Sequence, residues 1–179
     1  MVKWKEEDNN LLLSFAADFD GYMESSLAEW RSNTSRIIIS PGRVLFSIKR
    51  MTNVLDENPQ VKITIDRIMK LISSRRITWV RKIDQEIPRR LLIWQNALRE
   101  YMEEGLDSSY KAQVVHRVIL DLLEQEARLL PADYQRKKEA LDAELKGLIS
   151  PGQFIWDNEL AELFSCDNYW YLYVKLRKG

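Results

Sequence analysis

The longest helical pattern in the chain, residues 59–87, most constrains what the sequence can fold into. Its apolar residues recur at steps of three and four, which is the period of an amphipathic helix. These residues are Val61, Ile65, Ile68, Ile72, Trp79, Val80, Ile83 and Ile87. Asn58 and Pro59 suit the cap and the first position of a helix, and Pro88 suits its end. We therefore expect one long helix up to Pro88, although Val61–Ile65 alone could form a strand.

Most of the other segments also have helical periodicity. The expected helices cover about residues 8–31, 88–104, 109–130 and 133–145. Residues 36–49 have two interpretations, a β-hairpin that turns at Pro41-Gly42 or a helix capped by Ser40 with Pro41 at its first position. We favour the helix, because Pro-Gly suits a type II turn better than the turns of tight hairpins. Residues 168–177 fit either a buried strand or the end of a helix.

Together these patterns predict a mainly α fold. We expect a bundle of six or seven helices, with one small β-hairpin or C-terminal strand. The length of 179 residues suits a single helical domain, 1–179. Only six glycines and five prolines occur, which argues against long disordered or linker segments.

Composition excludes several classes of protein. A single cysteine, Cys166, excludes an intramolecular disulfide and any zinc or iron–sulfur site built from cysteines of one chain. No run of 18 apolar residues occurs, and the first residues are polar where a secretory signal needs an apolar core. We therefore expect a cytoplasmic protein that does not bind a membrane.

The neutral total charge conceals a basic middle segment. Residues 1–42 carry 4 basic and 7 acidic side chains, residues 43–90 carry 12 and 5, and residues 91–179 carry 11 and 15. On a helical wheel, the cations of residues 59–87 share an arc of about 140°, opposite the apolar residues. Arg89 and Arg90 follow directly after this helix. The candidate binding residues for an anionic partner are Arg67, Lys70, Arg75, Arg81, Lys82, Arg89 and Arg90.

Arg76 falls within the apolar arc of the same wheel. A buried arginine is costly unless a carboxylate receives it. We expect Arg76 to pair with an acidic residue of another helix, or else to mark a kink near Ser73-Ser74.

The basic arc has two interpretations. It can neutralise acidic elements of the same fold or of a partner protein, or it can contact nucleic-acid phosphates without reading sequence. Part of this segment resembles the central helix of GINS replication subunits, which are helical proteins of replisome assembly. The similarity spans about 26 residues and adds weight to the interpretation as a scaffold. It rests on Asp66-Arg67-Ile68, Ser73-Ser74, Lys82-Ile83-Asp84, Pro88 and Leu91.

Signals for catalysis are sparse. The one histidine, His116, lies in an apolar run and is expected to be structural rather than the partner of a nucleophilic Cys166. No Glu precedes His116 by three residues, which excludes the di-iron bundles, and no glycine-rich phosphate loop occurs.

Two acidic pairs allow an alternative function. Asp121/Glu124 and Glu139/Asp142 resemble the metal-binding pairs of the all-α, MazG-like nucleotide pyrophosphatases, although the first pair starts with Asp. That resemblance would imply Mg²⁺ at these four residues. Five acidic pairs with this spacing occur in the chain, and random placement predicts ~4, so charged helix surfaces account for them equally well.

We therefore expect a non-enzymatic helical binding or scaffold protein without catalytic residues, metal or cofactor. Its partner is expected to be another protein or a second copy of the chain, bound through the basic face of residues 59–90. A nucleic-acid-binding protein and a small Mg²⁺-dependent pyrophosphatase are the alternatives. The aromatic segment 169–173 is expected to belong to the core, and would form a dimerisation patch if it were exposed.

Overall fold

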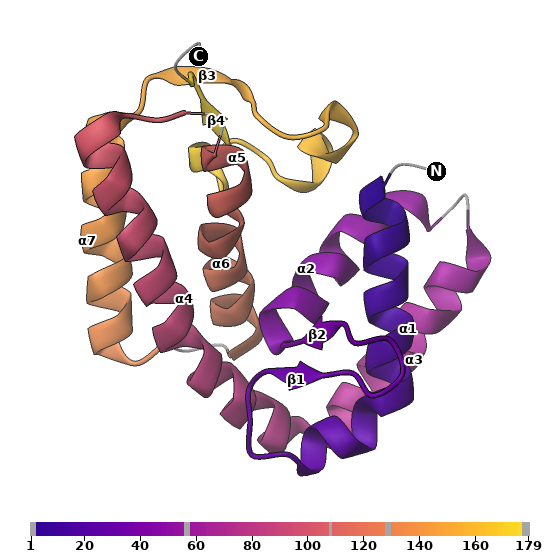
Figure 1. The fold of residues 1–179 in the computed structure, drawn as a ribbon. Coiled ribbons are helices and arrows are strands. Elements are labelled where there is room, and N and C mark those ends of the chain that lie inside the picture. Colours follow the sequence, from indigo (N-terminus) through magenta and orange to yellow (C-terminus); the bar gives the residue numbers. More distant parts are fainter. Residues whose placement is uncertain (1–2, 56–57, 108, 128–129, 177–179) are drawn as a thin grey trace. The chain divides into compact units, whose positions relative to one another are not determined.

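The computed structural model of the chain describes residues 3–55, 58–107, 109–127 and 130–176, and within these residues the fold is mainly α with small strand pairs (Figure 1). This confirms the predicted fold class. The α-helices are α1 Lys3–Glu24, α2 Pro41–Met51, α3 Pro59–Ser74, α4 Arg76–Glu104, α5 Tyr110–Gln113, α6 Val115–Ala127 and α7 Ala132–Leu148. The 3₁₀ helices are η1 Thr52–Val54, η2 Asn158–Leu163 and η3 Trp170–Leu172. The strands are β1 Trp30–Arg31, β2 Ile38–Ile39, β3 Pro151–Phe154 and β4 Tyr173–Val174.

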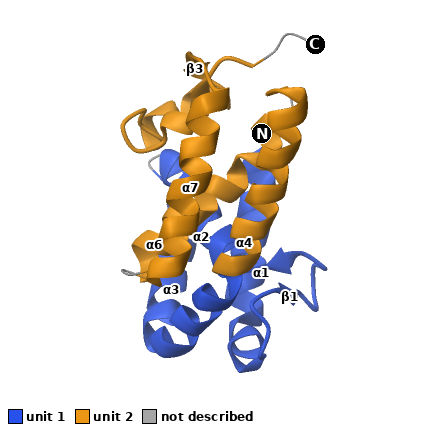
Figure 2. Ribbon diagram, turned by 90° about the vertical axis from the view of Figure 1, so that its left-hand side faces the viewer, with its two compact units in different colours: residues 1–86 blue, residues 87–179 orange. Residues whose placement is uncertain are grey.

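The chain divides into two compact units, residues 1–86 and residues 87–179 (Figure 2). The prediction of a single domain stays a prediction. Helix α4 begins in the first unit and ends in the second. None of the described helices combines the length and the apolar character that a membrane span requires.

The first unit is built around α1, which packs against α2 and α3. One side of α1 is a stripe of large side chains, and Phe15, Phe19 and Tyr22 are almost completely buried there. The Phe15 ring lies 5.7 Å from that of Trp79 in α4. Burial of such aromatic side chains is the main stabilising contribution to a core of this size.

Residues 36–49 contain both elements that the sequence left open. Ser40 caps α2 by accepting a hydrogen bond from the Arg43 amide, and Pro41 opens the helix, as the favoured interpretation predicts. A short hairpin precedes it, with β2 antiparallel to β1 and Ile39 opposite Trp30. The prediction that a hairpin turns at Pro41-Gly42 is wrong, because the turn lies before β2. The expected helix 8–31 is also too long, since α1 ends at Glu24.

The predicted helix 59–87 is two helices. Arg75 leaves helical geometry with φ −124° and ψ 33°, so α3 ends at Ser74. Ser73 and Ser74 donate their hydroxyls back to the carbonyl oxygens of Met69 and Leu71, and such bonds weaken and bend helices. A kink near Ser73-Ser74 was the alternative interpretation of Arg76, and the structure contains this break. Arg76 itself is half-buried at the start of α4.

Pro88 does not end the helix, which is a second correction. Helix α4 continues through Pro88 to Glu104, so the predicted helix 88–104 is the second part of α4 and not a separate helix. Proline removes one backbone hydrogen bond and costs about 3 kcal/mol inside a helix. The packing of α4 offsets this cost, because Ile87, Leu91 and Trp94 on either side of the proline are buried.

Glu86 of α4 binds the N-terminal end of α2. Its buried carboxylate accepts the Ser40 hydroxyl at 2.8 Å and the Gly42 amide at 2.7 Å. A helix N-terminus presents unpaired amides and a partial positive charge, and a carboxylate satisfies both. The contact fastens α4 to α2 within the first unit.

Replacement of Glu86 by glutamine is expected to lower the free energy of unfolding by about 2 kcal/mol, because hydrogen bonds to a charged group are lost. Urea denaturation followed by circular dichroism measures this difference. The matched control is Asp84→Asn, an exposed residue of the same helix, which is expected to change stability by less than about 0.5 kcal/mol. Equal effects of the two substitutions would contradict this role of Glu86.

The second unit combines α5, α6, α7 and the C-terminal strand pair. The expected helix 109–130 is divided at Val114 into α5 and α6, and α7 covers the predicted helix 133–145. Within residues 168–177, the described part forms η3 and β4, so the strand interpretation is right for two residues. Gly152 in β3 lies so close to β4 that a Cβ atom there would be 2.4 Å from the Val174 carbonyl carbon.

The aromatic C-terminal segment belongs to the core of this unit. Tyr169, Tyr171 and Leu172 are buried, and Tyr110 of α5 donates a hydrogen bond to the Tyr171 carbonyl oxygen at 2.9 Å. Burial leaves these side chains no part in a dimerisation patch.

Candidate functional site

The seven candidate cations do not all face outward. Five are exposed, and two are buried. The exposed residues are Arg67, Lys70, Arg75, Arg81 and Arg89. The buried residues are Lys82 and Arg90. A helical wheel that treats residues 59–87 as a single helix places some side chains on the wrong face, because a new helix begins at Arg76.

Lys82 is buried inside the first unit and bonds to its backbone. Its side chain is 1% exposed, and the ammonium donates to the carbonyl oxygens of Ser25 at 2.9 Å and Leu27 at 2.7 Å. It also lies 4.3 Å from the centre of the Tyr22 ring. Burial, with a smaller effect of neighbouring Arg81, lowers the pKa of Lys82 to about 8. Lys82 therefore stabilises the chain segment that follows α1 and is not available to bind a partner.

Arg90 is 7% exposed and lies in the second unit. Its guanidinium is 2.9 Å from Nδ1 of His116 in α6. Arginine only donates hydrogen bonds, so Nδ1 accepts and the imidazole is neutral. Burial, followed by the positive charges of Arg90 and Arg89, lowers the pKa of His116 to about 4. His116 therefore makes a structural contact with Arg90, and among the described residues it has no hydrogen bond with Cys166.

The remaining cations lie exposed on α3, at the break at Arg75 and on the first turns of α4. Arg67, Lys70, Arg75 and Arg81 have no ion pair or hydrogen bond of their side chains among the described residues. Each therefore keeps its charge available to a partner. Arg89 is exposed as well, but it has interactions of its own.

Two exposed isoleucines lie beside these cations. Ile63 is 59% exposed and precedes Arg67 by four residues, and Ile77 is 89% exposed and precedes Arg81 by four. Residues four apart are neighbours on a helix surface. We call the set of Ile63, Arg67, Lys70, Arg75, Ile77 and Arg81 the α3–α4 face.

The isoleucines are functional candidates that the sequence analysis missed. On the wheel used for residues 59–87, Ile63 falls inside the basic arc, at about 320° when Arg67 is at 0°. An apolar residue among cations was therefore a visible signal. Ile63 was overlooked because the sequence analysis considered only the apolar residues on the arc opposite the cations.

The four carboxylates of the pyrophosphatase alternative are not arranged around an open space. Arg117 of α6 binds Asp142 of α7 with two hydrogen bonds of 2.7 Å each, and it also pairs with Asp121. Lys138 pairs with Asp121 at 3.4 Å and forms a closer ion pair with Glu124. Two cations thus hold the positions between the carboxylates that Mg²⁺ would need.

Glu139, the remaining member, is exposed and accepts a hydrogen bond from Gln135. Across the described ranges, no three His, Cys, Asp or Glu side chains are grouped in a way that could hold a metal ion. The arrangement is that of a structural ion-pair network between α6 and α7. Its central residue, Arg117, is 4% exposed and was not singled out from the sequence, although its spacing to Asp121 was a signal.

Comparisons with protein families, with curated proteins and with solved structures find no match to this chain. The local similarities to GINS subunits and to MazG-like enzymes are therefore not supported by a family match.

Proposed function

We propose that this chain is a non-enzymatic binding protein and that its α3–α4 face binds an acidic protein partner. The observation that carries this proposal is the combination of four cations without partners in the described part of the chain and two exposed isoleucines on the same helix segments. Single exposed cations or apolar residues are ordinary, but Ile63 and Ile77, which are 59% and 89% exposed, each lie one helical turn from an arginine that has no partner among the described residues.

The isoleucines favour a protein partner over a nucleic acid. Protein interfaces combine an apolar centre with arginine, whereas contacts to phosphate backbones use charge and hydrogen bonds. A partner segment with acidic residues around an apolar centre would match the α3–α4 face on both counts. Its carboxylates would pair with Arg67, Lys70, Arg75 and Arg81, and its apolar side chains would cover Ile63 and Ile77.

The ion-pair network of the second unit favours binding over catalysis as well. Three of the four carboxylates that a pyrophosphatase would use, Asp121, Glu124 and Asp142, are already paired with Arg117 or Lys138. We propose a cytoplasmic location for this interaction, because the only cysteine, Cys166, is an exposed free thiol, which suits a reducing compartment.

Site-specific photo-cross-linking in cells tests this proposal. A photoreactive phenylalanine analogue at position 77 is expected to give a defined adduct with an acidic protein, and the adduct should be lost in the Arg67→Glu/Arg81→Glu variant. The same analogue at Leu13, an exposed residue of α1, is the control and should not give that adduct. Adducts with nucleic acid, or with a second copy of the chain, would identify a different partner class. An adduct that survives charge reversal would contradict the proposal.

A further inference from the structure

The chain after α7, orange to yellow in Figure 1, carries a cluster of aromatic rings that are in contact with one another. The ring centre of Phe154 lies 5.3 Å from that of Tyr173 and 6.2 Å from that of Trp156. All three side chains are half-buried, so part of each is exposed to solvent. Trp156 in turn contacts the buried ring of Phe164, which contacts that of Tyr169. The cluster therefore extends from the core of the second unit to its surface.

Hydrogen bonds to the backbone hold two of the exposed rings in place. The Trp156 indole donates to the Lys111 carbonyl oxygen at 2.8 Å, and the Tyr173 hydroxyl donates to the Phe164 carbonyl oxygen at 2.9 Å. These polar atoms are used within the unit, so the rings offer a partner mainly their aromatic carbon atoms. Because the rings are fixed before a partner arrives, their ordering adds little to the entropic cost of binding.

The charges beside these rings are mainly negative. The segment from β3 to β4 contains four exposed carboxylates and no lysine or arginine. Asp157 follows Trp156 directly, and Glu162 follows Ala161, whose carbonyl oxygen lies 3.4 Å from the Tyr173 hydroxyl. The carboxylates of Asp157 and Glu162 have no ion pair or hydrogen bond in the described part of the chain. Both therefore keep their charge available to a partner.

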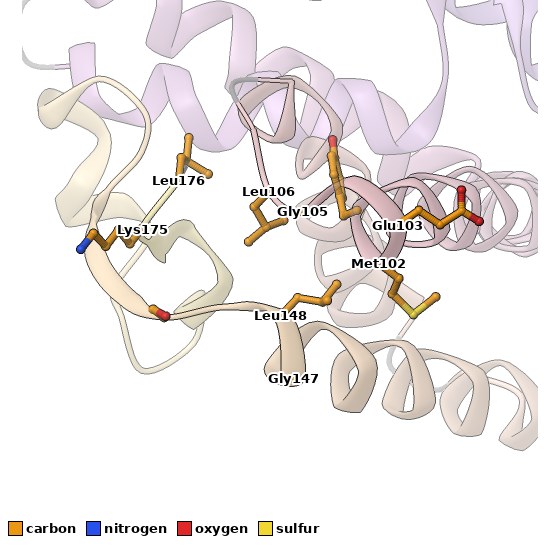
Figure 3. Close-up of a pocket in the computed structure, with 10 residues that line it drawn as sticks. Met102, Glu103, Gly105, Leu106, Gly147, Leu148, Lys175 and Leu176 are labelled. Atoms are coloured by element: carbon orange, nitrogen blue, oxygen red, sulfur yellow. The ribbon is translucent and has the colours of Figure 1, made fainter. Parts of the chain in front are cut away.

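Two lysines border this segment without reversing its charge. Lys111 is exposed at the position whose carbonyl group binds Trp156, and Lys175 follows β4. The Lys175 ammonium points outward, away from the hollow that Leu106 and Leu148 line at the ends of α4 and α7 (Figure 3). With four carboxylates against two ammonium groups, the surface keeps a net negative charge.

Aromatic rings beside carboxylates favour a cation, and an arginine in particular. The faces of the rings are negative, and they attract a cation that lies within about 6 Å of the ring centre. A guanidinium is planar, so it can stack on a ring and pair with a carboxylate at the same time. The interior of the second unit already contains this combination, because Arg117 lies 4.7 Å from the Tyr171 ring centre and pairs with Asp121. Nucleic-acid phosphates, in contrast, would be repelled by the carboxylates.

We propose that the exposed end of this cluster binds an arginine-containing basic segment of another protein. A guanidinium of the partner would lie over the exposed rings and pair with the neighbouring carboxylates. The residues of this binding surface are Phe154, Trp156, Asp157, Glu162 and Tyr173. The surface belongs to the second unit and the α3–α4 face to the first, so the proposal does not depend on the proposed function.

Titration of the ¹⁵N-labelled protein with the peptide acetyl-Gly-Arg-Gly-Arg-Gly-amide, followed by NMR, tests the proposal. The signal of the Trp156 indole N–H is expected to shift saturably. The matched peptide has citrulline in place of both arginines, which keeps the planar shape but removes the charge. It should bind at least about tenfold more weakly. No saturable shift of the Trp156 signal with the arginine peptide would overturn the proposal, and so would equal binding of the two peptides.

Three variants locate the binding surface. Asp157→Asn/Glu162→Gln removes two exposed charges and should weaken binding of the arginine peptide about three- to tenfold. The matched control, Glu139→Gln/Glu144→Gln, removes two exposed charges from α7 and should change binding by less than about twofold. Phe154→Leu should also weaken binding, with circular dichroism as the check of folding. Equal effects of the two charge variants would overturn the assignment of this surface, and so would unchanged binding in a folded Phe154→Leu variant.

Discussion

Replacement of Arg117 by methionine is expected to lower the free energy of unfolding by about 3–5 kcal/mol, because it leaves the mostly buried carboxylate of Asp142 without its cation. Arg117 joins α6 to α7 through Asp142 and pairs with Asp121 in its own helix. Tyr171 binds the same Asp121 at 2.7 Å, and the Arg117 guanidinium lies 4.7 Å from the Tyr171 ring centre. These contacts also raise the pKa of Arg117 above its ordinary value, despite burial.

Urea denaturation measures this loss of stability, and two further variants test whether the ion pairs cause it. The matched control is Arg136→Met in α7, because Arg136 also pairs with an aspartate but its side chain is 75% exposed. This control should change stability by less than about 1 kcal/mol. The double variant Arg117→Met/Asp142→Leu should recover part of the loss by removing the unpaired charge. If Arg117→Met were as mild as Arg136→Met, the network would not hold the second unit together.

Acidification from pH 6.5 to pH 4 is expected to remove about 1–2 kcal/mol of stability through His116 alone, because solvent around this partly exposed side chain screens the effect. The pKa of His116 is lowered from 6.5 to about 4 in the folded protein, mainly by burial and then by Arg90 and Arg89. Between these two values the unfolded chain binds a proton that the folded chain does not. The contribution of His116 is therefore fully present above pH 6.5 and is lost as the pH falls towards 4.

The His116→Gln variant separates this effect from that of other titrating groups. Glutamine can accept the hydrogen bond of Arg90 through its side-chain oxygen but does not titrate. Urea denaturation at several pH values should give a difference between wild type and variant that changes by about 1–2 kcal/mol between pH 6.5 and 4. A constant difference across this range would show that His116 titrates normally in the folded protein.

Much of the fold could be predicted because apolar periodicity and caps are local signals. Ser40 and Pro41 mark the start of α2, and Asn58 and Pro59 mark the start of α3, as expected. The break at Arg75 was a weaker signal, since two serines can also lie inside a helix. The continuation of α4 through Pro88 could not be predicted, because it depends on tertiary packing that outweighs the cost of proline.

The candidate site was only partly predictable, for a similar reason. Sequence shows which residues carry charge but not which charges the fold uses internally. Lys82, Glu86 and Arg90 are spaced by four residues, so they follow one side of α4, and all three are buried. Their partners come from distant segments, such as the carbonyl groups after α1 and the imidazole of His116. Such pairings arise only when the chain has folded.

The central claim, that the α3–α4 face binds an acidic protein segment, is tested most directly by fluorescence polarisation. The probes are a labelled peptide of alternating acidic and apolar residues and a labelled DNA duplex, each at two salt concentrations. The wild type should bind the peptide, and Arg67→Glu/Arg81→Glu should abolish binding, whereas the control Lys62→Glu, an exposed change outside this face, should not. Ile63→Ser/Ile77→Ser should weaken peptide binding as well. Binding of the duplex alone, unaffected by the isoleucine substitutions and lost at higher salt, would contradict the claim.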